Sequence, residues 1–418
     1  MNLDERYPCI DDLARKAACR LPRFAHEYLI GGIGREAALA RNRITLDAVH
    51  FDPCYLPEAP ANRPDMTVEL LGRHYDLPFG VSPVGLSGLM WPRAVEILAK
   101  AAKRANIPFG LSNFATTHMS DVAAIAAPNA WCQLYPACDP GIRSTMLDEI
   151  ATAGYEVLVV TIDIPSATRR DRELRVGLSV PPRITPETFW QILTHPRWAF
   201  ATALAGKPQF ENILRYIPEG LSMAEKAAFL TGIVEGHVTQ DTLRGIRERW
   251  RGKLIVKGII NARDAMVALD CGADAIWVSH HGARQLDANR TTVEALPSIR
   301  AAVGAKTAVI ADSGPRTGLD IARMIALGAD FVFLGRAFVY AVAALGRKGG
   351  DHAVHILREE LRCAMAQIGC GSVRELPAFR PSDSPAAHNC PPRPARGVEP
   401  SPTLKVSVNC DQPVKPHS

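Results

Sequence analysis

From Leu77 onward, short apolar runs alternate with longer stretches in which apolar residues recur at helical spacing. The short runs lack polar alternation, as expected for parallel strands buried on both faces. Eight such runs follow one another along the chain, at 78–84, 108–112, 130–135, 157–162, 253–257, 275–279, 308–312 and 331–334. Amphipathic helical segments lie between them, among them 93–104, 143–153, 262–271 and 319–327.

Eight strand and helix units predict an α/β fold in which the sheet closes on itself, the TIM (β/α)8 barrel, whose usual size is about 250 residues before insertions. The alternative is an open doubly wound sheet, which carries a GxGxxG turn after its first strand. No such turn follows Val81. The closed barrel is therefore the favoured architecture.

Three segments lie outside the repeating units. Residues 1–76 predict a helical extension, with one helix beginning near Arg23 and ending before Gly31-Gly32. Residues 177–236 form an insertion after the fourth strand, because this connection is too long for a single crossover. Residues 380–418 are rich in Pro and Ser and predict a disordered tail. We therefore expect the barrel with its extension and insertion to occupy residues 1–379.

The insertion contains an apolar and aromatic stretch within residues 184–205, at 189–193 and 198–200. His195, Arg197 and Lys207 lie close by in sequence. Such a segment is typical of a surface that dips into a membrane. A lid packed on the barrel mouth, or on a neighbouring subunit, explains the same pattern equally well.

Composition narrows the class of protein. The chain has 418 residues, of which 47% are hydrophobic and 22% charged, and its net charge of +5 does not call for nucleic acid. The first six residues are charged and unlike a signal peptide, and no apolar run spans a bilayer. The ten cysteines lack CxxC spacing, so no metal site is expected. We expect a cytoplasmic protein, with peripheral contact to the inner face of the membrane through residues 184–205.

The loop after the sixth predicted strand carries the strongest chemical signal. The apolar run Ile276-Trp277-Val278 passes directly into polar residues, and His281 and Arg284 stand three residues apart around Gly282. A titratable imidazole beside a guanidinium that binds carboxylates is what proton abstraction next to a carboxylate requires. The alternative is an ordinary solvated loop.

Polar residues also follow the other predicted strands. In a barrel, the loops after the carboxyl ends of the strands open on one face, so residues far apart in sequence converge there. The segments concerned are Pro83-Val84-Gly85, Ser112-Asn113, Gln133-Leu134-Tyr135, Thr161-Ile162-Asp163, Lys257-Gly258, Ser279-His280-His281, Asp312-Ser313-Gly314 and Gly335-Arg336.

The last two units predict a phosphate site. Ser313-Gly314-Pro315-Arg316 leads into a helix, and Gly335-Arg336 follows the last strand. Backbone N–H groups at a helix start and two guanidinium groups suit a phosphate, and this is the common phosphate position of such barrels. Each arginine alone could equally form a surface salt bridge.

These residues resemble a known family, the FMN-dependent 2-hydroxy acid dehydrogenases and oxidases, which include mandelate dehydrogenase, flavin-type L-lactate dehydrogenase and glycolate oxidase. The similarity runs from about Tyr7 to Phe379. Its most specific motif is 279–287, Ser-His-His-Gly-Ala-Arg-Gln-Leu-Asp. One position departs from the family, because His280 stands where Asn usually precedes the catalytic histidine. Either His280 replaces the hydrogen bonds of that Asn, or the pocket and its pH dependence differ.

The resemblance implies a role for each polar position. His281 would be the active-site base, held by the carboxylate of Asp163, which would fix its tautomer and favour the imidazolium formed during turnover. The implied catalytic residues are His281, Asp163, Tyr135 and Lys257, and the implied substrate-binding residues are Tyr28, Arg170 and Arg284. A core aromatic, a solvated loop charge and a structural ion pair remain the alternatives for Tyr28, Arg170 and Lys257.

The resemblance also implies FMN as the cofactor. Lys257 would lie against the ring atoms that become negative on reduction. The flavin ring would be lined by Pro83, Val84, Gly85, Ser112, Gln133 and Thr161, and cofactor binding would also involve Ser279. Asp312, Gly314, Arg316, Gly335 and Arg336 would hold the ribityl chain and the phosphate.

The implied reaction moves an electron pair from the α-carbon of an (S)-2-hydroxy acid to flavin and yields a 2-oxo acid, by either a carbanion or a hydride route. Gly85 stands where oxidases of the family commonly have Ala, so a quinone or similar acceptor is favoured over oxygen with release of hydrogen peroxide. A homo-oligomer, in the family a tetramer, is expected. A barrel isomerase or lyase with the same phosphate cradle, or a non-enzymatic binding module, would need no flavin.

Overall fold

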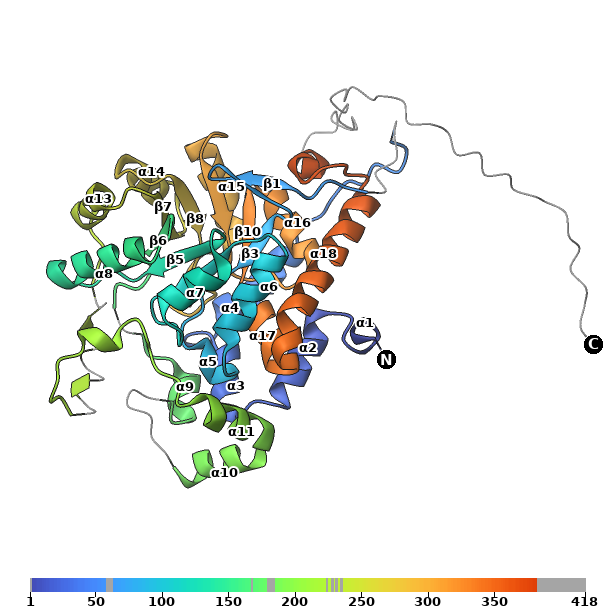
Figure 1. The fold of residues 1–418 in the computed structure, drawn as a ribbon. Helices are drawn as coiled ribbons and strands as arrows, with labels where there is room; N and C mark the ends of the chain where they lie inside the picture. The colour runs from blue at the N-terminus through green and yellow to red at the C-terminus, as the bar shows by residue number, and fades with distance from the viewer. Residues whose placement is uncertain are drawn as a thin grey trace, which may run out of the picture.

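The computed structural model describes residues 2–57, 63–166, 168–178, 185–222, 225–226, 229, 232–233 and 236–381. Eight parallel strands close into a barrel in the order β10-β3-β4-β5-β6-β7-β8-β9 (Figure 1). They are β3 (Phe79–Val81), β4 (Phe109–Ser112), β5 (Ala130–Leu134), β6 (Val157–Thr161), β7 (Lys253–Ile259), β8 (Ala275–Val278), β9 (Ala308–Ala311) and β10 (Phe331–Leu334). The predicted TIM barrel is confirmed, and each strand falls within or beside its predicted run.

Two strands end two or more residues away from the predicted position. β3 ends at Val81 rather than at Val84, because Pro83 has no N–H group to continue the ladder. β7 runs two residues beyond Lys257, past an irregularity in its pairing with β8. This irregularity lies at the end of the barrel where the polar residues gather.

Helices alternate with the strands and cover the outside of the barrel (Figure 1). The four helices predicted between strands are confirmed to within three residues at their ends. The covering helices are α6 (Ala94–Arg104), α7 (Met119–Ala126), α8 (Pro140–Thr152), α13 (Gln240–Arg249), α14 (Ala262–Asp270), α15 (Thr292–Val303), α16 (Gly318–Ala326), α17 (Arg336–Leu345) and α18 (Gly349–Ile368), with the short α5 (Ser87–Met90), η2 (Gly346–Lys348) and η3 (Val373–Phe379).

The N-terminal extension is helical only in its first part, as α1 (Leu3–Arg6), α2 (Ile10–Ala18), α3 (Arg23–Ile30) and α4 (Ala37–Asp47). The prediction of helix up to residue 76 is wrong at its end, where β1 (Val68–Leu70) pairs antiparallel with β2 (Arg73–Tyr75). Leu71 and Gly72 both have positive φ, which forms the tight turn that a two-residue hairpin needs. β1 also alternates buried and exposed positions, but three residues are too few to reveal that period in a sequence.

Large aromatic side chains fill the inside of the barrel. The ring of Phe333 lies 4.3 Å from Trp277 and 5.2 Å from Trp131, centroid to centroid. Phe331, one layer away, contacts Tyr75 of the β1–β2 hairpin at 5.7 Å. The hairpin therefore covers the amino end of a packed barrel, and the polar residues that follow the strands lie at the opposite, carboxyl end.

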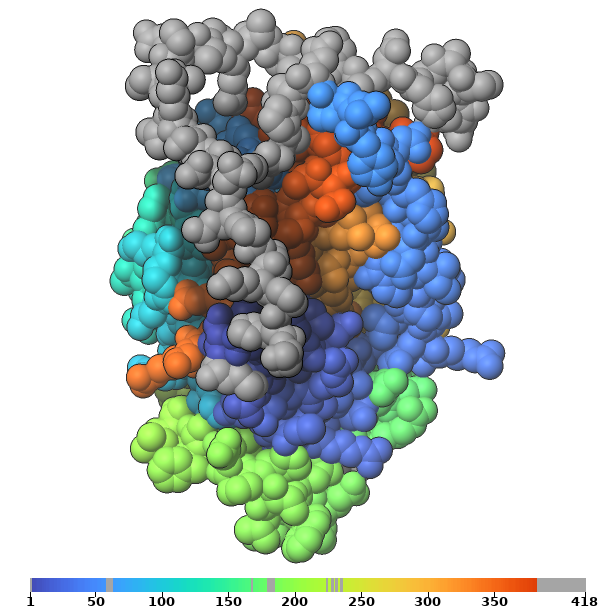
Figure 2. Space-filling model, turned by 90° about the vertical axis from the view of Figure 1, so that its right-hand side faces the viewer, coloured from blue at the N-terminus to red at the C-terminus, as the bar shows by residue number. Residues whose placement is uncertain are grey.

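The carboxyl end is covered by the extension and the insertion. In the described part of the insertion, α10 (Pro186–Thr194) and α11 (Pro196–Ala205) form a helix pair, followed by η1 (Leu214–Tyr216). Trp198 of α11 packs edge-on against Phe24 of α3 at 5.6 Å and donates its indole N–H to the Leu89 carbonyl at 2.9 Å. Figures 1 and 2 show this helix pair beside the N-terminal helices, at the opposite end from β1.

Two predictions concern segments that are incompletely described. Residues 382–418 of the predicted disordered tail lie outside the described residues, as do residues 179–184 and several positions between 223 and 235 of the insertion. Among the helices that are described, none has the length and apolar character needed to cross a membrane.

Candidate active site

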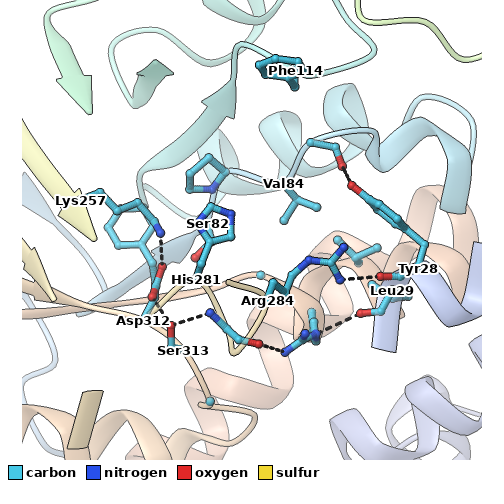
Figure 3. Close-up of a pocket in the computed structure, with 18 of the residues that line it drawn as sticks. Tyr28, Leu29, Ser82, Val84, Phe114, Lys257, His281, Arg284, Asp312 and Ser313 are labelled. Carbon is cyan, nitrogen blue, oxygen red and sulfur yellow. Dashed lines mark hydrogen bonds and ion pairs between the residues drawn. The ribbon is translucent and has the colours of Figure 1, made fainter. Parts of the chain in front are cut away.

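A cavity of about 320 Å³ lies at the carboxyl ends of the strands (Figure 3). It brings together residues from the extension, from the strand ends and from the loop before α9 (Asp171–Arg175). The sequence-predicted residues that line it are Tyr28, Pro83, Val84, Gly85, Tyr135, Arg170, Lys257, His281, Arg284, Asp312, Gly314, Arg316, Gly335 and Arg336. The other predicted residues, Ser112, Gln133, Thr161, Asp163 and Ser279, do not line it and lie behind its wall.

His281 is held from both sides of its ring. Its Nδ1 lies 2.9 Å from Oδ1 of Asp163, and its Nε2 lies 3.3 Å from the hydroxyl of Tyr135. Its backbone has a φ of +56°, and its N–H donates to Oγ of Ser279 at 3.1 Å. Because a carboxylate accepts the Nδ1 proton, Nε2 carries the free lone pair of the neutral ring.

Charge and burial keep this pair as an ionised carboxylate and a neutral imidazole. Burial lowers the pKa of His281, an effect that Asp163 opposes and the nearby cations Lys257 and Arg170 reinforce. Burial by itself would raise the pKa of Asp163, but its interaction and hydrogen bond with His281, together with the charge of Lys257, bring that pKa below its usual value. A neutral imidazole with an unprotonated Nε2 is the form in which histidine acts as a base.

His280 is a structural residue. Its Nδ1 accepts the N–H of Ala283 at 2.8 Å and its Nε2 lies 2.7 Å from Oδ1 of Asn42, on α4. Burial lowers the pKa of His280 to about 4. Both ring nitrogens are therefore in use, and His280 ties the His281 loop to the N-terminal extension.

Lys257 lies at the end of β7 and is almost fully buried. Its Nζ donates to Oγ of Ser279 at 2.8 Å. The same Nζ lies 3.3 Å from Oδ2 of Asp312 (Figure 3). The next residue, Gly258, has a φ of +105°, and a Cβ there would lie 2.7 Å from Cβ of Asp163. Only glycine lets the end of β7 pass this close to Asp163.

Arg284 and Arg170 share one acidic partner. Nη2 of Arg284 donates to Oε1 of Glu173 at 2.8 Å, and Nη1 of Arg170 donates to the same oxygen at 3.3 Å. Nη1 of Arg284 binds the carbonyls of Tyr28 and Gly31, and its guanidinium stacks 4.7 Å from the Tyr28 ring. The two arginines thus form a fixed cationic wall at the mouth of the cavity.

The predicted phosphate cradle contains two arginines that have no ion pair with any described carboxylate. Arg336 donates to the carbonyls of Leu29, Gly31 and Gly282 at 2.8–3.1 Å. Burial, together with the charge of Arg316, lowers the pKa of Arg336 to about 9. The salt-bridge alternative is therefore not what the structure shows, and the positive charge here calls for an anion.

A buried acceptor behind the wall also lacks a partner. Nε2 of Gln133 donates to Oγ1 of Thr161 at 2.9 Å, but Oε1 of Gln133 is buried and has no hydrogen bond among the described residues. A buried amide oxygen without a donor costs roughly 1–3 kcal/mol. An N–H group of a bound ligand would satisfy it.

Several residues around the site were not anticipated. Ser313 donates to Asp312 and accepts N–H groups from His280 and Gly282, so it braces the loop, and only its position within the quoted Asp312-Ser313-Gly314 motif hinted at this. Phe210 lines the cavity from the insertion, and Glu173 comes from α9. Neither carries a local sequence signal.

The barrel, the cavity and its positive charge suit a ligand that has a hydrogen-bonding ring and a phosphate. Comparison with known proteins agrees: residues 17–380 match the FMN-dependent dehydrogenase family. L-lactate dehydrogenase of Alcaligenes faecalis is 36% identical over 366 residues, 87% of this chain and 96% of that protein. L-lactate dehydrogenase of Xanthomonas campestris is 38% identical over 368 residues, 87% and 94% respectively. The chain belongs to the FMN-dependent dehydrogenase family and is an oxidoreductase.

Solved structures give the same result. The monotopic membrane protein (S)-mandelate dehydrogenase superposes with a TM-score of 0.84 at 32% identity, over 89% of this chain and 98% of that one. A mandelate oxidase superposes with a TM-score of 0.73 at 30% identity, over 88% and 97%. The cofactor is FMN. The unpartnered Gln133 oxygen and the Arg316 and Arg336 cradle fit the N–H groups of a flavin ring and a phosphate.

Proposed function

We propose that the protein oxidises an (S)-2-hydroxy acid of the lactate or mandelate class to the 2-oxo acid and passes the electrons to a quinone or similar acceptor. The observation that carries this proposal is the arrangement of His281, with Nε2 unprotonated, beside the Arg284 and Arg170 pair in one cavity. A base next to a carboxylate-binding fork suits a substrate whose reacting carbon is attached to a carboxylate. The lactate and mandelate dehydrogenases among the similar proteins support this substrate class.

In this proposal the chain binds and orients the substrate. Arg284 and Arg170 bind its carboxylate, and Tyr28, whose hydroxyl now donates to the Gly85 carbonyl at 3.3 Å, turns to the same group. Tyr135 hydrogen-bonds the substrate hydroxyl. Burial raises the pKa of Tyr135, so it stays protonated and is able to donate.

His281 then takes one proton at Nε2, either from the hydroxyl or from the α-carbon. Asp163 stabilises the imidazolium that results. Bound FMN would supply the acceptor for the electron pair of the α-carbon. Lys257 would hold a positive charge beside the flavin ring, which would favour the reduced form.

For the cofactor, we propose that its ring lies against Pro83, Val84 and Gly85 and is bound by polar groups of the adjacent strand ends. Its ribityl chain and phosphate would be bound at the ends of β9 and β10. The further polar contacts proposed are Ser112, Gln133, Thr161, Ser279, Asp312, Gly314, Arg316, Gly335 and Arg336. This assignment would satisfy Oε1 of Gln133 and neutralise the arginine pair.

We further propose that the acceptor is met at a membrane surface, through α10 and α11. These helices carry large apolar side chains that are exposed, among them Trp190 at 64% and Phe200 at 72%. The similarity to (S)-mandelate dehydrogenase, a monotopic membrane protein, supports this. Transfer to a membrane quinone would then need no soluble carrier.

The test is flavin reduction followed by stopped flow under anaerobic conditions, with a panel of 2-hydroxy acids. His281→Gln should keep its bound flavin and lose reduction by at least about 10³-fold, since it removes a general base. The flavin absorbance of the variant, equal to that of the unaltered protein, serves as the control for folding. Near-normal reduction in His281→Gln would remove His281 from the mechanism, and peroxide formed stoichiometrically with product in air would identify an oxidase instead.

A further inference from the structure

Glu173 lies between the two arginines that are proposed to bind the substrate carboxylate. One oxygen, Oε1, accepts from Arg284 at 2.8 Å and from Arg170 at 3.3 Å. The three side chains are only 14–20% exposed. An ion pair this sheltered from water is far less screened than a surface pair.

Glu173 cannot readily move away from this position. It lies on α9, three residues after Arg170, and the neighbouring Arg172 binds Glu27 and Glu36 of the N-terminal extension. These two ion pairs hold α9 against α3 and against the start of α4. The carboxylate of Glu173 is therefore a fixed part of the cavity wall.

The charges at this wall do not cancel. Arg170 and Arg284 contribute two positive charges and Glu173 one negative charge, which leaves one positive charge for a ligand. Nε of Arg170 is also buried with no hydrogen-bond partner among the described residues, so the wall keeps an unused donor. One further carboxylate would complete both the charge balance and the hydrogen bonds.

We propose that Glu173 is a specificity-determining residue: it is a fixed internal anion that leaves the wall formed with Arg170 and Arg284 at one positive unit. It thereby favours ligands that carry a single negative charge and limits how tightly they bind. This inference rests on the proposed function, in which Arg170 and Arg284 bind the substrate carboxylate. A purely structural Glu173 would only hold Arg284 in place, and its loss would weaken every ligand alike.

The test uses Glu173→Gln in the FMN-loaded protein. Glutamine keeps an oxygen that accepts the arginine N–H groups and nearly the same volume, and it removes the charge. Binding is measured by the change in flavin absorbance on titration with oxamate, a monoanion, and oxalate, a dianion of almost the same shape. Glu187→Gln is the matched control, because the substitution removes the same charge outside the cavity. Glu187 lies on α10, and its side chain is 68% exposed.

We expect Glu173→Gln to bind oxamate several-fold more tightly, and oxalate at least tenfold more tightly, since the repulsion of a partly buried anion grows with ligand charge. Glu187→Gln should change neither. Weaker binding of both ligands, or equal gains for the two, would overturn the proposal and leave Glu173 as a structural residue.

The proposed function is tested separately in the same protein. Suppose that a 2-hydroxy acid reduces the flavin, but the affinity for oxalate relative to oxamate is the same in Glu173→Gln as in the unaltered chain. In that case only the role of Glu173 is wrong. If no 2-hydroxy acid reduces the flavin, the proposed function itself is wrong, whatever the titrations show.

Discussion

Two adjacent histidines have opposite roles because of what their ring nitrogens contact. His280 uses Nδ1 and Nε2 for Ala283 and Asn42, so neither nitrogen can exchange a proton without breaking a buried bond. His281 uses Nδ1 for Asp163, and its Nε2 lies at the cavity beside Tyr135. The His280 departure from the family's usual Asn therefore concerns the position of the loop rather than proton transfer.

The surroundings of His281 predict the pH dependence of the reaction. The base must be neutral, so activity falls as pH falls through its pKa. Because burial lowers that pKa below its ordinary 6.5, we expect the acid limb of kcat/KM to lie below pH 6.5. Asp163 raises the pKa of His281, so Asp163→Asn should move the acid limb to still lower pH.

At the pH plateau, Asp163→Asn should also slow the reaction by about 10³-fold. Without the carboxylate, the imidazolium has no counter-charge and the neutral ring is no longer held in one tautomer. Both effects can be read from the rate of flavin reduction between pH 5 and 8, with flavin content measured alongside. An acid limb that shifts upward in Asp163→Asn would contradict this account of the pair.

At the scale of elements, α16 depends on a close approach that only glycine allows. Gly318 begins the helix, and a Cβ there would lie 2.1 Å from the Leu361 nitrogen and 2.6 Å from the Leu357 carbonyl oxygen, both backbone atoms of α18. We expect Gly318→Ala to destabilise the fold by about 1–3 kcal/mol or more, because backbone cannot yield as a flexible side chain does. The measurement is thermal unfolding of the FMN-free protein.

Gly245 provides the matched control. It lies inside α13, where a Cβ would meet nothing within 4 Å. Alanine there should stabilise the helix by about 0.5–1 kcal/mol, since it restricts the unfolded chain without a clash. If the two alanine variants shifted the unfolding temperature in the same direction, helix packing at Gly318 would not be the cause.

How much of the fold and of the site could be predicted from the sequence differs from one element to the next. The eight barrel strands were predictable because each is a continuous apolar run, and the carboxyl-end residues followed because barrel topology makes them converge. The β1–β2 hairpin was missed because its strands are three residues long. Glu173, Asn42 and Phe210 reach the site region from outside the strand ends, and the sequence contains nothing that relates their positions to His281.

For the whole molecule, the barrel mouth is covered by α3 of the N-terminal extension and by α9 and the α10–α11 pair, which follow β6 far along the chain. α3, α9 and the α10–α11 pair are joined by Arg172 with Glu27, by Trp198 with Phe24, and by Gln191, whose Oε1 accepts the Phe24 N–H at 3.1 Å. The inner side of the α10–α11 pair thus packs against other parts of the protein. Its outer side is apolar and exposed, which is unusual for a surface in water.

This outer surface leads to the prediction for the molecule as a whole. Each large side chain moved from water to apolar surroundings contributes about 1.5–3 kcal/mol, so Trp190→Ser combined with Phe200→Ser should weaken binding to phospholipid vesicles by at least about tenfold. Vesicle sedimentation measures this, and flavin reduction by a 2-hydroxy acid should be unchanged because neither residue lines the cavity.

The control pair is Tyr55→Ser with Leu56→Ser, at residues that are 75% and 96% exposed. They follow Cys54, whose N–H donates to the last carbonyl of α18. Equal losses in the two pairs would mean that α10 and α11 are not the membrane surface.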